Sequence, residues 1–242
     1  MPNRKPQAGS RKPAPDLAGI QTFIYGAGGH GRVVLEILLS WPRPRNRIAF
    51  IDDGIKRATV DGVRVLRSLP MVDPTRHPPA HVIVAIGDNQ QRWELSNIVE
   101  AGGWKLGCAI HPSAVLARTA QIAEGTMICA RACVGPGAVV GAGCILNTGC
   151  DVDHDCQIGH HCHIAPGAVL CGRVVVGPGC LIGAGAILLP GCTIGSHAIV
   201  GAGALIKQGQ VVPGHATMVG LPGRCIGAED DAIAWGGKTV FG

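Results

Sequence analysis

Aliphatic side chains recur at every sixth residue through the second half of the chain. From Ile110 to Met218, nineteen consecutive positions at this spacing are all aliphatic or methionine. The apolar fraction of the whole chain is 47%, so chance does not explain an unbroken run of this length. A fixed short period of this kind indicates an internal structural repeat.

A second column of small side chains lies two residues before each aliphatic position. From Ala120 to Ala204 this column contains only Ala, Cys, Thr or Val. An inward aliphatic residue and an inward small residue beside a tight turn are what one short strand of a triangular coil requires. Three such strands make a coil of 18 residues, and the stretch 110–218 therefore predicts six stacked coils. Stacking pairs each backbone group with the coil above or below.

Six of the eleven cysteines belong to the small inward column: Cys144, Cys150, Cys156, Cys162, Cys180 and Cys192. A buried thiol behaves as a compact apolar group. The sequence contains no CxxC pair. We therefore expect these cysteines to pack in a core, without disulfides or metal, as in a reducing compartment.

The first half of the chain alternates strand and helix patterns. Strands are predicted over Thr22–Tyr25, Ile48–Ile51 and His81–Ile86, and helices over Arg32–Ser40 and Gln90–Ala101. This alternation favours a small parallel sheet with ligand-binding loops at the carboxyl ends of its strands. The expected fold class is thus an α/β N-terminal half-Rossmann domain followed by an all-β parallel β-helix.

A glycine-rich turn follows the first predicted strand. Residues 26–31 match G-x-G-x-x-G, a pattern that presents backbone N–H groups and a helix N-terminus to a pyrophosphate. Asp52 stands about 20 residues further on, where a dinucleotide site has a ribose-binding acid. However, this domain has room for only one of the two halves that NAD requires. We therefore expect a nucleoside diphosphate and not NAD, with a ligand-free glycine turn as the alternative.

Four of the ten histidines lie between Asn147 and His163. A metal site is not expected, because His154 and His160 are six residues apart and so belong to successive faces of the coil. His154 has an aspartate on each side, and a neighbouring carboxylate raises imidazole basicity and fixes its tautomer. These properties suit a general base, and a surface-turn histidine is the alternative.

Together these motifs resemble one subfamily of the hexapeptide-repeat acyltransferases. The motifs are the glycine-rich half-Rossmann domain, the strand end IDD, the turn AIGDN and the NTG…DHD…H segment. The subfamily comprises the UDP-4-amino-sugar N-acetyltransferases and the sialic acid O-acetyltransferase-like enzymes, and the resemblance covers about residues 21–226. It implies a left-handed β-helix and acetyl-CoA as co-substrate, with no metal.

The resemblance also implies roles for individual residues. His154 is the expected base, and Asp155 is expected to raise its basicity, although the second aspartate, Asp153, leaves open which carboxylate orients the ring. Positions that match acetyl-CoA contacts are His163, Gly172, Ala184 and Ala202. Positions that match nucleotide-sugar contacts are Gly28, Gly29, His30, Asp52, Asp53, Gly87 and Asn147.

The resulting expectation is a homotrimeric cytoplasmic enzyme of surface-glycan synthesis. It would transfer acetyl from acetyl-CoA to the 4-amino or 3-amino group of a UDP-linked sugar, by direct attack. Two alternatives remain: an O-acetyltransferase acting on a sialic-type sugar, and a non-catalytic nucleotide-sugar-binding module.

Charge and boundaries complete the prediction. The net charge is +5, and residues 1–16 contribute +3 of it, so the remainder predicts no nucleic-acid partner. Residues 174–206 lack charged side chains, but regularly spaced Gly and Pro argue against a membrane span. We expect a disordered basic tail over 1–19, a nucleotide-sugar domain over 20–106, the β-helix over 107–226 and a C-terminal tail over 227–242.

Overall fold

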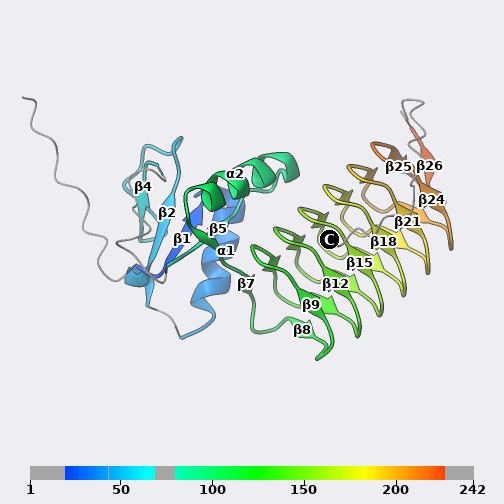
Figure 1. Cartoon of the computed structure of the whole chain (residues 1–242), viewed down its shortest axis with the longest axis horizontal. Helices are drawn as coiled ribbons and strands as arrows, with labels where there is room; N and C mark the ends of the chain where they lie inside the picture. Colours follow the sequence, from blue (N-terminus) through cyan, green and yellow to red (C-terminus); the bar gives the residue numbers. More distant parts are fainter. Residues whose placement is uncertain (1–19, 43, 69–79, 227–242) are drawn as a thin grey trace, which may run out of the picture.

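The computed structural model describes residues 20–42, 44–68 and 80–226; the predicted terminal tails lie outside these residues. An α/β unit stands at one end of a long parallel β-helix (Figure 1). Within the described ranges, no helix is both long and apolar enough to cross a membrane.

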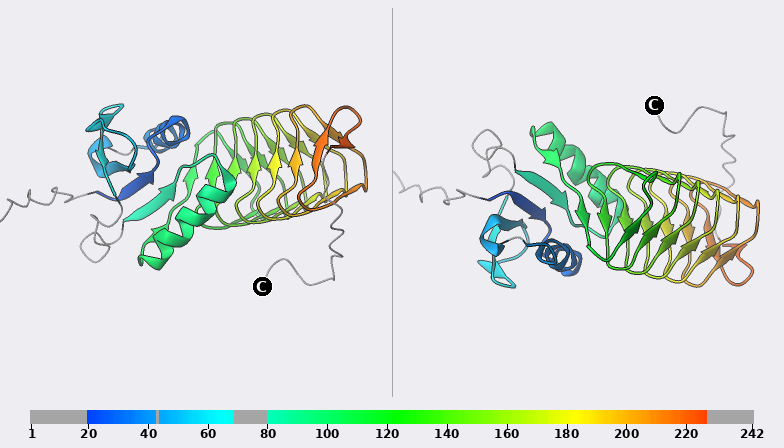
Figure 2. Two further views of the ribbon diagram at one scale, coloured as in Figure 1. Left: turned by 90° about the horizontal axis from the view of Figure 1, so that it is seen from above. Right: turned by 90° about the horizontal axis from the view of Figure 1, so that it is seen from below.

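The α/β unit is built on a six-stranded sheet in the order β3-β4-β2-β1-β5-β6, parallel except for the β3–β4 pair. Its strands are β1 (Thr22–Tyr25), β2 (Ile48–Ile51), β3 (Thr59–Val60), β4 (Val63–Leu66), β5 (His81–Val84) and β6 (Lys105–Leu106). Its helices are α1 (Gly29–Leu39), the 3₁₀ turn η1 (Arg45–Arg47) and α2 (Asn89–Ala101). One helix covers each face: α1 packs with Ile24 and Phe50, and α2 packs with Phe23 and Val82 (Figure 2).

Two predicted strands have the expected bounds, and three elements differ. The strand at His81 ends at Val84, two residues early, because Ala85 and Ile86 already lead into the turn at Gly87. Helix α1 begins at Gly29 because the glycine-rich turn itself forms its first residues. Helix α2 begins at Asn89, after Asp88, whose side chain caps the N–H of Gln91.

The β3–β4 hairpin was missed because β3 has only two residues, too few for a periodic pattern. Its signal in the sequence is the dipeptide Asp61-Gly62, both with positive φ (47° and 76°). Asp-Gly is a preferred pair for a tight hairpin turn.

The β-helix has three faces, each a parallel sheet whose strands are one coil apart. The first face contains β7 (Ala109–Ile110), β10 (Met127–Ile128), β13 (Ile145–Leu146), β16 (His163–Ile164), β19 (Leu181–Ile182), β22 (Ile199–Val200) and β25 (Thr217–Val219), with β26 (Arg224–Cys225) antiparallel at its end. The second contains β8 (Val115–Leu116), β11 (Cys133–Val134), β14 (Asp151–Val152), β17 (Val169–Leu170), β20 (Ile187–Leu188) and β23 (Leu205–Ile206). The third contains β9 (Gln121–Ile122), β12 (Val139–Val140), β15 (Gln157–Ile158), β18 (Val175–Val176), β21 (Thr193–Ile194) and β24 (Val211–Val212). The predicted six coils and the 18-residue register are confirmed.

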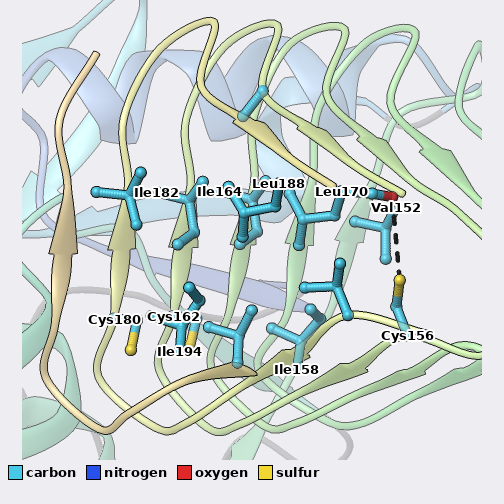
Figure 3. Close-up of a cluster of buried hydrophobic side chains, with 14 of the residues drawn as sticks. Val152, Cys156, Ile158, Cys162, Ile164, Leu170, Cys180, Ile182, Leu188 and Ile194 are labelled. Carbon is cyan, nitrogen blue, oxygen red and sulfur yellow. Dashed lines mark hydrogen bonds between the residues drawn. The ribbon is translucent and has the colours of Figure 1, made fainter. Parts of the chain in front are cut away.

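The core of the β-helix consists of the two inward columns (Figure 3). From Val134 to Val212 the aliphatic column is at most 2% exposed, and the six cysteines of the small column are fully buried. All eleven cysteines are free thiols. The prediction that the column cysteines pack as core residues is confirmed.

Each corner of the β-helix contains a residue in the left-handed region of backbone conformation. These residues recur every six positions from Gly125 to His215, with φ between 57° and 71° except at His161, where φ is 53°. Glycine occupies most of them, and the others are Arg131, Asp155, His161, Arg173, His197 and His215. The sequence analysis did not identify this third column, since its members share a conformation and not a hydropathy.

The α/β unit covers the start of the first face. The outward residues Ala109, Met127 and Ile145 are fully buried in a common apolar cluster with Val34 and Ile37 of α1. Beyond β13 the same face becomes accessible, and Ile199 is 42% exposed. One face of the β-helix is thus divided between an interdomain core and an open surface.

Helix α2 docks on the corner between the third and first faces through Asn89, Arg92 and Trp93. The Asn89 amide donates to the carbonyls of Gly179 and Cys180, at 3.0 and 2.9 Å. Trp93 stacks with the rings of His161 and His197, at centroid distances of 5.7 and 6.1 Å. The corner position between these histidines, 18 residues from each, is Gly179, so the indole takes the place that a side chain there would fill.

Three histidines buried near this interface are held neutral. Burial lowers the pKa of His30, His161 and His163 to about 4, and the nearby Arg92 charge adds to the effect in all three. The Nε2 of His30 and the Nδ1 of His161 are buried without a partner among the described residues. Protonation of any of the three would place a second cation beside a buried guanidinium.

We therefore predict that the protein loses stability as pH falls from about 6.5 to about 4. The unfolded chain binds protons at these histidines near pH 6.5, whereas the folded chain does not until about pH 4, so protons favour unfolding in that window. Melting temperature measured from pH 7.5 to 4.5 tests this. His161→Asn, which suits the left-handed corner, should flatten the dependence, and a constant melting temperature would contradict the prediction.

Candidate functional site

The glycine-rich loop leaves an open helix N-terminus. Gly26 has a φ of 98°, and a Cβ on Gly31 would collide with the Gly26 carbonyl, so both positions require glycine. Gly28 is the N-cap of α1, with no side-chain cap, and neither Gly28 nor Gly29 has a neighbour within 4 Å of a Cβ built there. Backbone N–H groups at such a terminus are ready donors for an anion such as a diphosphate.

The two aspartates at the end of β2 differ in their contacts. Asp52 accepts from three backbone amides: those of Ala27, Gly54 and Ile55, at 2.8 to 2.9 Å. Its carboxylate therefore fastens the glycine-rich loop to the loop after β2. Asp53 accepts only a long hydrogen bond from the Tyr25 hydroxyl, at 3.4 Å, which leaves it available to a ligand.

A polar cluster joins the end of β5 to the first face of the β-helix. The Asn147 amide nitrogen lies 3.1 Å from His163 Nε2, and its Oδ1 accepts from the Thr148 N–H at 2.8 Å. Since Asn147 donates, His163 Nε2 is an acceptor and Nδ1 carries the proton. Nδ1–H is then the donor in the hydrogen bond of His163 with the Gly87 backbone. Predicted sugar residues Asn147 and Gly87 therefore flank the predicted acetyl-CoA residue His163, and the two domains meet there.

Two cavities adjoin these loops. One of about 410 Å³ lies between the domains and is lined by Gly87, Asn89, Trp93, His163, Leu181 and Ile199, among others. The other, of about 540 Å³, lies within the α/β unit beside the glycine-rich loop and is lined by Ala27, Arg32, Lys56, Arg57 and Thr59, among others. Its cations suit a phosphorylated ligand.

His154 lies at the corner between the second and third faces. Its Nδ1 is 2.9 Å from Asp155 Oδ2, and its side chain is 44% exposed. Asp153 instead accepts from the backbone N–H of His154, at 2.7 Å. The ring is thus paired with Asp155, and with Nδ1–H donating to the carboxylate, Nε2 keeps a free lone pair.

Gly172 lies one coil further along the same corner, under the His154 ring. A Cβ built on Gly172 would touch His154 Nε2 first. Its φ lies outside the left-handed region, and prolines follow or precede it at the same corner in Pro136 and Pro190. The backbone there accepts side chains, and the absence of one at residue 172 is what lets the imidazole lie flat against the coil.

The predicted site residues therefore form two separate groups in one chain. Gly28, Gly29, His30, Gly87, Asn147 and His163 lie at the first face or the loops above it. His154, Asp155 and Gly172 lie at the corner between the second and third faces, which is opposite the first face in a triangular coil. Ala184 and Ala202 lie at the third location, the corner between the first and second faces.

The sequence analysis missed Arg92 and the docking residues beside it. A signal was available for Trp93, because the histidines at 161, 197 and 215 are interrupted only by Gly179 at the same spacing. No signal marked Arg92, since an arginine early in an amphipathic helix is usually solvated. Nowhere in the described ranges do three or more metal-ligating side chains gather closely enough to hold an ion.

Comparison with known proteins identifies both halves of the chain. The PglD N-terminal domain matches residues 21–99, and the bacterial transferase hexapeptide (six repeats) matches 137–172 and 173–208. The UDP-N-acetylbacillosamine N-acetyltransferase of Bacillus subtilis (strain 168) is 36% identical over 112 residues, which is 44% of this chain and 50% of that protein.

Solved structures match over a longer span. A mutant of perosamine N-acetyltransferase from Caulobacter crescentus, in complex with CoA and GDP-perosamine, is 35% identical, with a TM-score of 0.79 over 86% of this chain and 97% of that one. The acetyltransferase domain of PglB from Neisseria gonorrhoeae FA1090, in complex with acetyl coenzyme A, is 34% identical, with a TM-score of 0.78 over 85% and 98%.

These matches confirm the expected fold class and, for the family, the expected acetyl-CoA co-substrate. The chain belongs to the acetyl-CoA-dependent sugar N-acetyltransferases that join a PglD N-terminal domain to a hexapeptide-repeat β-helix.

Proposed function

We propose that this protein transfers the acetyl group of acetyl-CoA to the amine of a UDP-linked 4-amino or 3-amino sugar, with His154 as general base. The observation that carries the proposal is the exposed His154 ring, paired at Nδ1 with Asp155 and free at Nε2. Two relatives are named for different nucleotides, UDP and GDP. The uridine nucleotide is therefore the part of the proposal that binding measurements must decide.

The chain's own residues supply binding and proton transfer. The open N-terminus of α1 and the cations Arg32, Lys56 and Arg57 would hold the diphosphate. The sheet order β2-β1-β5 aligns the ends of these strands, so that a nucleotide over β2 and β1 directs its sugar towards Gly87. His154 Nε2 would take the proton from the attacking amine, and Asp155 would stabilise the imidazolium that forms. A backbone N–H would stabilise the oxyanion.

We propose further that the active site lies between copies of the chain in a homotrimer. Within one chain, His154 and the Gly87–His163 cluster lie on opposite sides of the β-helix. A neighbouring β-helix packed beside the open part of the first face would bring its own His154 to that cluster. Apolar residues exposed on the other faces, Val115, Ile187 and Val211, are consistent with such packing.

We predict that His154→Ala lowers kcat by about 10²–10⁴-fold, the usual contribution of a positioned base. Stability should change by about 0.5 kcal/mol or less, because the ring is outside the core. Asp155→Asn should lose less activity, since asparagine keeps the left-handed corner while removing the charge. Asp153→Asn is the matched control, because Asp153 contacts a backbone N–H and not the ring. Thiol release from acetyl-CoA measures each variant, and near-normal turnover by His154→Ala would refute the assignment.

We predict that Gly172→Ala lowers kcat by about 10²-fold, since a small misplacement of a catalytic group has an effect of that order. The new methyl group would push the His154 ring aside while leaving the backbone unchanged. The matched control is Gly214→Ala at the same corner position of a later coil, where the nearest atom to a Cβ is the Ser196 carbonyl oxygen at 3.1 Å. Equal activities of the two variants would contradict the role of Gly172.

We predict that two inactive variants, His154→Ala and His163→Ala, complement each other when mixed. A site formed between copies takes His154 from one chain and His163 from the next, so random mixing restores about a quarter of the sites. Activity after joint unfolding and refolding measures this. Mixed trimers without activity, or a stable active monomer of 24.9 kDa by sedimentation equilibrium, would contradict a shared site.

A further inference from the structure

Arg92 is a fully buried arginine whose partners in the described residues are oxygens of backbone carbonyls and of one amide. Its Nε donates to the Gly143 carbonyl at 2.7 Å, and its Nη2 donates to Asn89 Oδ1 at 2.7 Å and to the His161 carbonyl at 2.8 Å. Longer contacts reach the carbonyls of Cys162, Gly87 and Asp88, at 3.3 Å each. A buried charge without a carboxylate is costly unless many hydrogen bonds satisfy it, and here they do.

The partners of Arg92 come from two segments that carry the proposed site. Nη1 donates to the Ile86 carbonyl at 2.9 Å and so anchors the turn that contains Gly87. Nη2 anchors the strand entry at His161–Cys162, directly before His163. A planar guanidinium fixes the directions of its donors, so it sets both the distance and the angle between these segments.

Gly87 and His163 are also joined to each other. The His163 ring hydrogen bonds to the Gly87 backbone, and its other nitrogen accepts from Asn147. Any shift of the Gly87 turn relative to residues 161–162 would therefore break this bond and free the imidazole to rotate.

We propose that Arg92 is a positioning residue, which holds the turn that faces the sugar nucleotide in register with the His163 side chain that faces acetyl-CoA. It acts through Gly87 and His163 and touches neither substrate. The proposal rests on the proposed function for the identity of the two substrates, but the geometry of the Gly87–His163 pair tests it independently.

Arg92→Lys is the informative variant, because it keeps the charge and loses the planar fork. We expect kcat to fall by about 10²-fold, since small misalignments of bound groups have effects of that order. The dissociation constant of acetyl-CoA, measured by calorimetry, should change by less than the KM for the nucleotide sugar. In the proton spectrum, the His163 Nδ1–H signal, assigned by its loss in His163→Gln, should exchange with water much faster than in the wild type.

Ser96→Ala is the matched control. Ser96 is buried on the same helix one turn later and donates only to the Arg92 backbone carbonyl, at 2.8 Å. This variant loses a buried hydrogen bond without affecting the guanidinium, so kcat and the Nδ1–H signal should stay as in the wild type.

A folded Arg92→Lys protein with normal kcat and an unchanged Nδ1–H signal would overturn the proposal. So would a kcat loss that only follows the folded fraction. If Arg92→Lys does not fold, Asn89→Ala decides, because it removes one partner of the guanidinium and should weaken kcat and the signal in the same direction. If no nucleotide amino sugar is acetylated by the wild type, the proposed function fails, while the Nδ1–H exchange still judges the position of Arg92.

Discussion

The constraint on which the structure depends is the left-handed residue required at every corner of the β-helix. With one such residue every six positions, each strand is short, each corner turns alike and each coil has 18 residues. Coils then stack in register, and their inward side chains meet others of the same column. Because register fixes direction, the position of a side chain in the six-residue unit decides whether it is core, face or corner.

This constraint also gives the proposed catalytic pair its geometry. Asp155 is itself a left-handed corner residue, so its carboxylate projects beside the preceding His154 and not away from it. One coil later the same corner has Gly172, which leaves space for the imidazole. The base is thus positioned by backbone conformation at one residue and by a missing side chain at another.

The α/β unit meets the β-helix through polar contacts as well as through a core. Apolar residues of α1 cover the start of the first face, whereas α2 contributes an amide, a guanidinium and an indole to the neighbouring corner. Hydrogen bonds to backbone carbonyls are directional, and an apolar contact is not. The directional contacts therefore fix the turn at Gly87 relative to His163, which is where the two proposed substrates would approach each other.

The sequence by itself determined the β-helix, its number of coils, the burial of six cysteines and the parallel α/β domain, because these follow from periodicity. It also identified His154 and its two neighbouring aspartates as candidates. Only the tertiary structure decided that Asp155 and not Asp153 pairs with the ring, since this depends on the corner conformation at residue 155. Asp52, expected at a ribose, was found to bind three backbone amides, and Arg92 emerged from an ordinary helical pattern as a buried centre. Hydrogen bonds between residues far apart in the chain leave no period in the sequence, and for that physical reason they become visible only in the folded protein.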